Sequence, residues 1–268
     1  MTQPDFYAAV GKALYETDVA AKLSQVYALY DAITKGEIAP YEADDLTEIL
    51  PSGRPEKPEL VSPRDVPRRK IGSKEGVHAL IHSICHIEFN AINLGLDAAY
   101  RFRSMPERFY HDWLLVAKEE ADHFSMLADY LTSVGSSYGA FTAHNGLWDS
   151  AERTAHDPLI RMALVPRVLE ARGLDVTPGI INRLKEVGQT GVVAMLERIV
   201  REEEGHVIIG NRWYQYLCRE RNLDPKETFF SLLDEYEQTI RAPINTEARL
   251  RSGFTEEEIA LLLESIDL

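Results

Sequence analysis

The stretches EADH, at residues 120–123, and EEGH, at residues 203–206, are two copies of one short pattern, a glutamate followed three residues later by a histidine. Residues three apart on an α-helix share a face, so each copy can offer a carboxylate and an imidazole to one cation. A single copy is weak evidence, because such pairs also arise by chance on a solvated, glutamate-rich helix. Two copies predict a helical half-site that the chain uses twice.

A single glutamate precedes each copy at nearly the same interval. Glu88 lies 32 residues before Glu120, and Glu170 lies 33 residues before Glu203. With the two histidines, this gives six candidate ligands on four helical segments. The predicted metal ligands are Glu88, Glu120, His123, Glu170, Glu203 and His206.

The surroundings of the four glutamates indicate that they point into a core. At 3.6 residues per turn, the face that carries Glu88 also carries Ile81, Cys85, Ile92 and Gly95, and the other three glutamates lie on similarly apolar faces. Four buried carboxylates are costly unless something neutralises them. Two divalent cations would balance the four charges, which predicts a dinuclear site. The alternative is that the carboxylates share protons or water without metal.

Composition favours one all-α fold. The chain has 268 residues, 45% of them hydrophobic, and no stretch alternates as a half-buried strand does. It contains no apolar run of about twenty residues and no leader with a cleavage site, so we expect no membrane span and a cytoplasmic location. The formal charge of −14 argues against nonspecific binding to nucleic acids.

The pattern divides the chain into three parts. Residues 1–74 should form N-terminal helices and a proline-rich connection, residues 75–222 a four-helix bundle, and residues 223–268 a C-terminal helical extension. The expected bundle helices are 73–103, 105–134, a third from 157 and a fourth from 190 to 221. The third should bend at Pro166, stop near Gly173 and restart at Thr177.

The joint between the first two bundle helices is short, so they should be antiparallel. Ser104 is the expected N-cap of the second helix. Glu88 and Glu120 each lie 16 residues from Ser104, so folding the hairpin would bring the two carboxylates to the same height.

These residues resemble a known family. The segment 78–218, with HIE at 86–88 and EEADH at 119–123, is similar to the bacterial domain-of-unknown-function family 455. That family resembles the di-iron tRNA hydroxylases and, more distantly, rubrerythrins. The resemblance implies a ferritin-like four-helix bundle with additional N- and C-terminal helices, whose matching residues bind two metal ions. It also implies that Glu120 and Glu203 bridge the ions and take part in catalysis.

Two groups of residues beside the predicted ligands have open roles. Glu119 and Glu202 precede the two motif glutamates, where oxygen-activating relatives often have an aspartate that orients a ligand histidine. They are equally consistent with solvated surface acids. His78, His82 and His86 form a stripe away from the Glu88 face, which favours packing or hydrogen bonding over a second metal site.

Carboxylates with one imidazole per ion suit iron, with manganese possible, better than zinc or copper(I). The leading hypothesis is a dinuclear non-haem iron oxidoreductase that activates dioxygen to oxidise or hydroxylate an organic substrate, either a small molecule or a macromolecule, with electrons from an unidentified donor. The alternative is a ferritin-like protein that handles metal or destroys peroxide without an organic substrate.

Overall fold

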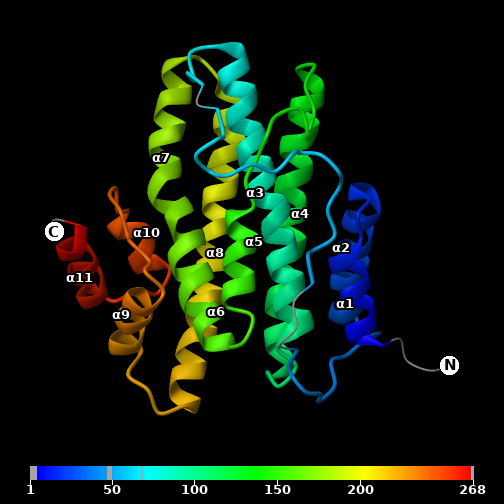
Figure 1. Cartoon of the computed structure of the whole chain (residues 1–268), viewed down its shortest axis with the longest axis vertical. Helices are drawn as coiled ribbons and strands as arrows, with labels where there is room; N and C mark the ends of the chain where they lie inside the picture. The colour runs from blue at the N-terminus through cyan, green and yellow to red at the C-terminus, as the bar shows by residue number, and fades with distance from the viewer. Residues whose placement is uncertain (1–4, 47–49, 68, 267–268) are drawn as a thin grey trace. The chain divides into compact units, whose positions relative to one another are not determined.

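The computed structural model describes residues 5–46, 50–67 and 69–266, and the regular elements among them are all helices. The one β-contact in this part of the chain is an isolated bridge between Leu60 and Ala143. The expected all-α helical bundle fold is therefore confirmed (Figure 1). The described helices include none that is long and apolar enough to cross a membrane.

The chain forms two compact units, Met1–His156 and Asp157–Leu268. The first contains α1 (Phe6–Tyr15), α2 (Val19–Thr34), α3 (Lys74–Arg101), α4 (Glu107–Ser133) and α5 (Gly146–Arg153). The second contains α6 (Pro158–Leu164), the π-helix η1 (Val165–Glu170), α7 (Ala171–Glu186), α8 (Thr190–Glu220), α9 (Pro225–Glu235), α10 (Thr246–Arg251) and α11 (Glu256–Ile266). The three-part division expected from the sequence remains a prediction.

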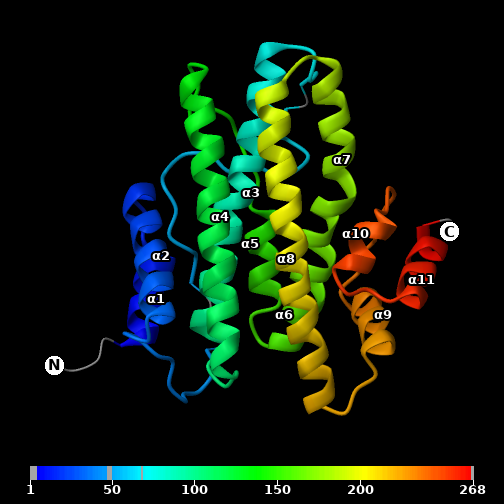
Figure 2. The ribbon, with the colours of Figure 1, turned by 180° about the vertical axis from the view of Figure 1, so that it is seen from behind.

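The centre of the first unit is the hairpin of α3 and α4, which lie side by side in Figures 1 and 2. The two helices approach closely at Gly95, where a Cβ atom would lie only 2.9 Å from the carbonyl oxygen of Trp113. The predicted N-cap of α4 was wrong. Pro106 occupies that position, because Ser104 donates its N–H and hydroxyl to the carboxylate of Asp45.

The N-terminal helices cover this hairpin, α1 against α3 and α2 against α4. Asp5, Asp18 and Ser73 cap α1, α2 and α3, each accepting a hydrogen bond from a backbone N–H in the first turn. Capping by such residues fixes where each helix begins. The segment after α4 includes the short helix α5, which packs against α3.

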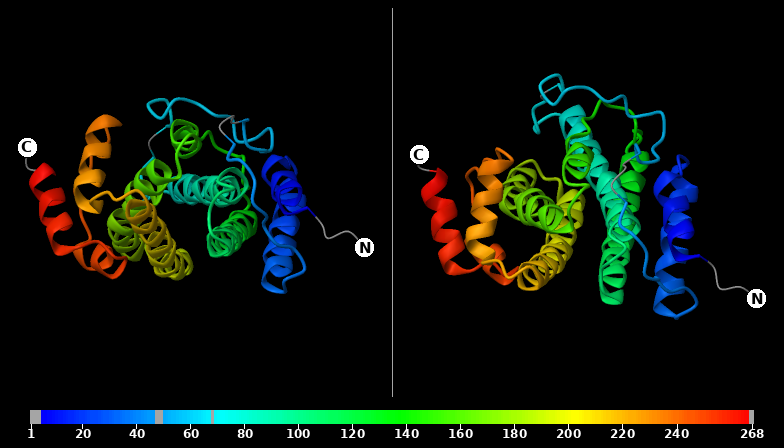
Figure 3. Two further views of the ribbon diagram at one scale, coloured as in Figure 1. Left: turned by 90° about the horizontal axis from the view of Figure 1, so that it is seen from below. Right: turned by 60° about the horizontal axis from the view of Figure 1, so that its bottom comes forward.

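In the second unit, α6, η1 and α7 follow one another and all pack against α8. The distortion expected at Pro166 takes the form of η1, whereas the predicted break between Gly173 and Thr177 was wrong. Helix α7 continues through Pro178, because its buried side chains Leu174, Ile181 and Leu184 continue one apolar face. Within this unit, helices α9, α10 and α11 lie to one side of the group formed by α6, η1, α7 and α8, as both views of Figure 3 show.

Candidate metal centre

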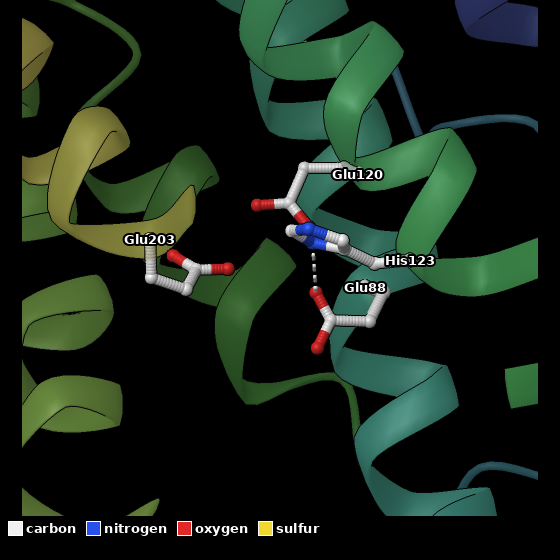
Figure 4. Close-up of side chains that lie close together, drawn as sticks. All are labelled: Glu88, Glu120, His123 and Glu203. Carbon is white, nitrogen blue, oxygen red and sulfur yellow. Dashed lines mark hydrogen bonds and ion pairs between the residues drawn. The ribbon is translucent and has the colours of Figure 1, made fainter. Parts of the chain in front are cut away.

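The α3–α4 hairpin brings three of the predicted ligands together in the first unit. Nδ1 of His123 lies 3.4 Å from Oε2 of Glu120 and 3.7 Å from Oε2 of Glu88. One potential ligand atom of each residue lies within 4.8 Å of the others (Figure 4). Glu120 and His123 are adjacent on α4, and Glu88 reaches them from α3, as the equal distance from the turn predicted.

Burial and neighbouring carboxyl groups make this cluster one that could hold a cation. All three side chains are almost completely buried. Burial, and then the neighbouring charge of Glu120, raise the pKa of Glu88 to about 8. Burial alone would lower the pKa of His123, but the hydrogen bond to Glu120 and the negative charges of Glu120 and Glu88 raise it to about 11. Negative charge on Glu88 is therefore disfavoured beside Glu120, while positive charge on His123 is favoured between the two carboxyl groups.

The residues of this cluster fit a metal ion. Oε2 of Glu88 is buried and accepts no hydrogen bond among the described residues, because Nδ1 of His123, at 3.7 Å, is too far away to donate one. A buried carboxylate oxygen without a donor is costly, and a coordinated cation would compensate it. Two carboxylates with one imidazole are a donor set suited to iron or manganese. A buried Glu/His group that could hold a metal ion is thus present in the first unit.

The second unit holds the repeated half of the pattern on α8. Nδ1 of His206 lies 3.4 Å from Oε2 of Glu203, the same distance as between His123 and Glu120. His206 is buried, while the Glu203 side chain, also drawn in Figure 4, is 12% exposed. The two Glu-x-x-His motifs therefore have the same local geometry in the two units.

Glu170, the sixth predicted ligand, is the last residue of η1 and is buried. Arg167 lies three residues earlier in η1 and is also buried. Its guanidinium donates to Asn211 and Glu258. Arg167 is therefore engaged with α8 and α11.

The histidine stripe of α3 makes hydrogen bonds to the segment after α4. His82 Nε2 accepts the N–H of Gly139 at 2.9 Å, and His86 Nδ1 lies 2.9 Å from the hydroxyl of Tyr138. Burial lowers the pKa of both histidines to about 4, so both imidazoles are neutral. His78 is only half-buried. Among the flanking acids, Glu202 accepts a hydrogen bond from Arg198 Nε at 3.0 Å.

Sequence reasoning missed Tyr138, whose ring packs against Phe89 and Phe124, the immediate neighbours of Glu88 and His123. Tyr138 lies in the connection after α4 and belongs to no helical pattern. The one sequence signal that could have found it is the histidine stripe, which implied a polar partner for α3.

Comparison with known proteins places the chain in a family. A family described as "Protein of unknown function (DUF455)" matches residues 15–260. The chain belongs to the DUF455 family. The match is wider than the segment 78–218 that carried the resemblance in the sequence, and includes all of α2, α9 and α10. The DUF455 match thus covers both Glu-x-x-His motifs and parts of the chain on either side of them.

An uncharacterised protein of Haemophilus influenzae is similar to this DUF455 chain. The two are 45% identical over 271 residues, which cover 97% of this chain and 94% of the relative. No solved structure matches the chain.

Proposed function

We propose that this DUF455 protein is a dinuclear non-haem oxidoreductase that uses iron, or manganese, to activate dioxygen and oxidise an organic substrate. The observation that carries the proposal is the buried cluster of Glu88, Glu120 and His123, which combines two carboxylates and an imidazole around a point that favours a cation. A metal pair of this kind supplies the electrons and the electrophilic charge that dioxygen needs to react.

In this proposal the second unit completes the site with Glu170, Glu203 and His206. Four carboxylates then neutralise two divalent ions, and each histidine supplies one neutral nitrogen ligand. The equal His–Glu distances on α4 and α8 support equivalent roles for the two motifs. Glu120 and Glu203 are proposed to bridge the ions.

The protein side chains around the first half-site would restrict access to it. Phe89, Phe124 and Tyr138 pack against one another beside Glu88 and His123. An apolar wall excludes water and strengthens the electrostatic interactions behind it. Electrons beyond those of the substrate would come from an external donor.

Metal analysis tests the proposal directly. The full chain should be purified under reducing conditions from iron-supplemented cells, analysed for metals, and followed by absorption spectroscopy on exposure to air. We expect about two iron ions per chain and an absorption band that develops with oxygen. Folded protein without iron or manganese would overturn the proposal.

Variants on α4 and α8 test the ligands. His123→Ala and Glu203→Ala should each reduce the bound metal at least about tenfold, because each removes a direct ligand. Circular dichroism should show unchanged helicity. The matched controls are His111→Ala on α4 and Glu204→Ala on α8, since His111 pairs with Glu107 and Glu204 with Arg251 at the surface. Equal metal content in ligand and control variants would contradict the assignment.

Oxygen and peroxide assays separate this reaction from the alternatives. Slow consumption of dioxygen by protein with two ions per chain supports an oxidoreductase whose substrate is absent from the assay. Iron bound far beyond two ions per chain would indicate metal storage, and rapid turnover of peroxide would indicate detoxification. Either result would replace the proposed reaction.

A further inference from the structure

The helix that carries Glu170 is irregular at the residues just before it. Pro166 has no N–H to donate, and its ring would clash with the carbonyl oxygen of Met162 in a regular α-helix. The π-helix η1 absorbs this conflict, and the N–H of Ala171 bonds to the carbonyl oxygen of Pro166 five residues earlier. A π-turn adds one residue to the helix, so it rotates later side chains by about 100° relative to α6. The direction in which the Glu170 side chain points therefore depends on η1.

Arg167 fixes η1 from the side of the C-terminal helices. Its guanidinium carbon lies 4.6, 4.2 and 4.6 Å from the ring centres of Tyr214, Phe229 and Phe254. Nη1 donates to Oδ1 of Asn211 at 2.6 Å, and Nη2 donates to Oε1 of Glu258. One side chain of the π-helix is thus attached to α8, α9 and α11, with 1% of its surface exposed.

The partner of Arg167 is itself held in place. Oε2 of Glu258 accepts the N–H of Thr255 at 2.9 Å, and the N–H of Glu258 donates to the hydroxyl of Thr255 at 3.1 Å. This reciprocal pair is a capping box at the start of α11. Because both Glu258 oxygens are used, its carboxylate has one orientation when Arg167 binds it.

A second arginine, Arg249 of α10, links the backbone of Arg167 to α7. Arg249 donates through Nη1 to the carbonyl oxygen of Arg167 at 3.5 Å, and through Nε and Nη2 to Asp175 at 3.0 and 2.7 Å. Arg249 and Asp175 are both buried. The C-terminal helices therefore contact η1 through its backbone as well as through Arg167.

We infer that Arg167 and Glu258 are positioning residues for Glu170, and that the C-terminal helices hold η1 in the register that directs this proposed ligand. The inference rests on the proposed function. A purely structural role is a poor explanation of the buried charges, because apolar residues of similar size are commonly as stabilising as a buried ion pair. The ion pair fixes the orientation of the Arg167 side chain and its distance from Glu258, which an apolar contact does not.

The double variant Arg167→Met/Glu258→Met separates positioning from stability, since it replaces the pair by apolar side chains of similar length. The full chain should be titrated with cobalt(II) in the absence of oxygen. Cobalt absorption bands report the number of ions and their ligand geometry. We expect a folded protein whose weaker cobalt ion binds at least about tenfold less tightly than in wild type, with altered bands.

The control is Lys226→Met/Glu257→Met. Lys226 and Glu257 form an exposed ion pair at 2.8 Å between α9 and α11, and Glu257 is one residue before Glu258 in the sequence. It should bind cobalt as wild type does. Glu258→Gln keeps an acceptor for Arg167 and should recover most of the affinity. Arg167→Lys keeps the charge but not the two-pronged donor, so it should lose part of the affinity even if the double variant does not fold.

The outcomes distinguish this inference from the proposed function. If the wild-type chain binds no cobalt, both the positioning role and the proposed function are wrong. Two cobalt ions with wild-type affinity and spectrum in the double variant, or in Arg167→Lys if the double variant is unfolded, would overturn the positioning role alone. Weaker binding in these variants with an unchanged control supports the inference.

Discussion

Lys22 is a buried ammonium group that joins three helices. Its Nζ donates to the carbonyl oxygens of Ala13 and Leu14 at 2.8 and 2.9 Å, and to Oδ1 of Asn93 at 2.7 Å. The first two acceptors belong to the last turn of α1, and Asn93 belongs to α3. Burial lowers the pKa of Lys22 from 10.5 to about 7.

This depressed pKa predicts a rise in stability with pH. Between pH 7 and 10.5 the unfolded chain holds a proton on Lys22 that the folded chain has released, so unfolding takes up a proton and becomes less favourable as pH rises. The gain is at most about 5 kcal/mol, since one pKa unit corresponds to about 1.4 kcal/mol. Lys22→Met should remove this part of the pH dependence, measured by urea unfolding at several pH values.

The exposed Lys35 on the same segment provides the control. It pairs with Asp31 at the surface, so Lys35→Met should leave the slope of stability against pH as in wild type. If wild type and Lys22→Met have the same slope between pH 7 and 10.5, Lys22 keeps an ordinary pKa and its three oxygen acceptors compensate fully for burial.

The contrast between Lys22 and the Glu/His cluster shows which single residues sequence can predict. Glu120 and His123 are three residues apart, and helical geometry alone places them together. The acceptor of Lys22 on α3 lies 71 residues away, and nothing near Lys22 in the sequence indicates that helix α2 buries it. The sequence therefore predicts side chains that local helical spacing brings together. It does not predict a contact that depends on packing between segments far apart in the chain.

At the scale of the helix, α8 and η1 approach each other closely at Gly210 and Pro166. A Cβ atom at Gly210 would lie 2.1 Å from Cβ of Pro166 and 2.4 Å from its Cγ. The proline ring is rigid, so the two helices would have to separate. Gly210→Ala should therefore destabilise the protein by at least about 2 kcal/mol, measured as a lower urea midpoint at an unchanged slope.

Gly179→Ala is the matched control, because Gly179 lies inside α7 with no atom within 4 Å of the added Cβ. Alanine is the better helix former, so this variant should gain about 0.5–1 kcal/mol. Similar effects of the two substitutions would show that α8 can move away from Pro166 without loss.

The elements that the sequence predicted well are those with long, uninterrupted patterns. Helices α3, α4 and α8 begin and end within a few residues of the expected positions. The interpretation failed where two signals competed: Pro178 indicated a helix start, but the apolar face of Leu174, Ile181 and Leu184 carries α7 through it. Pro166 indicated a kink, but whether it becomes a bend or a π-turn depends on α8 and the C-terminal helices.

At the scale of the whole chain, each compact unit contains one Glu-x-x-His motif on a long helix, and the first unit also contains Glu88. The sequence predicted this repetition because it lies in spacing along the chain. The proposed dinuclear site takes ligands from both units. Metal binding should then affect the stability of both units together, whereas two separate sites would each affect one unit alone.

Metal binding should slow amide hydrogen exchange in the helices of both units together. A ligand that binds only the folded state lowers the population of open forms, and does so for every element that supplies a ligand. Amide hydrogen exchange of the full chain, with manganese(II) and with chelator, should show slower exchange on metal addition in α3, α4 and α8. In Glu203→Ala/His206→Ala that protection should fall in α3 and α4 as well as in α8, because two carboxylates and one imidazole would no longer hold both ions. Undiminished protection of α3 and α4 in this variant would show that Glu88, Glu120 and His123 bind metal alone, and that the second motif belongs to a separate site.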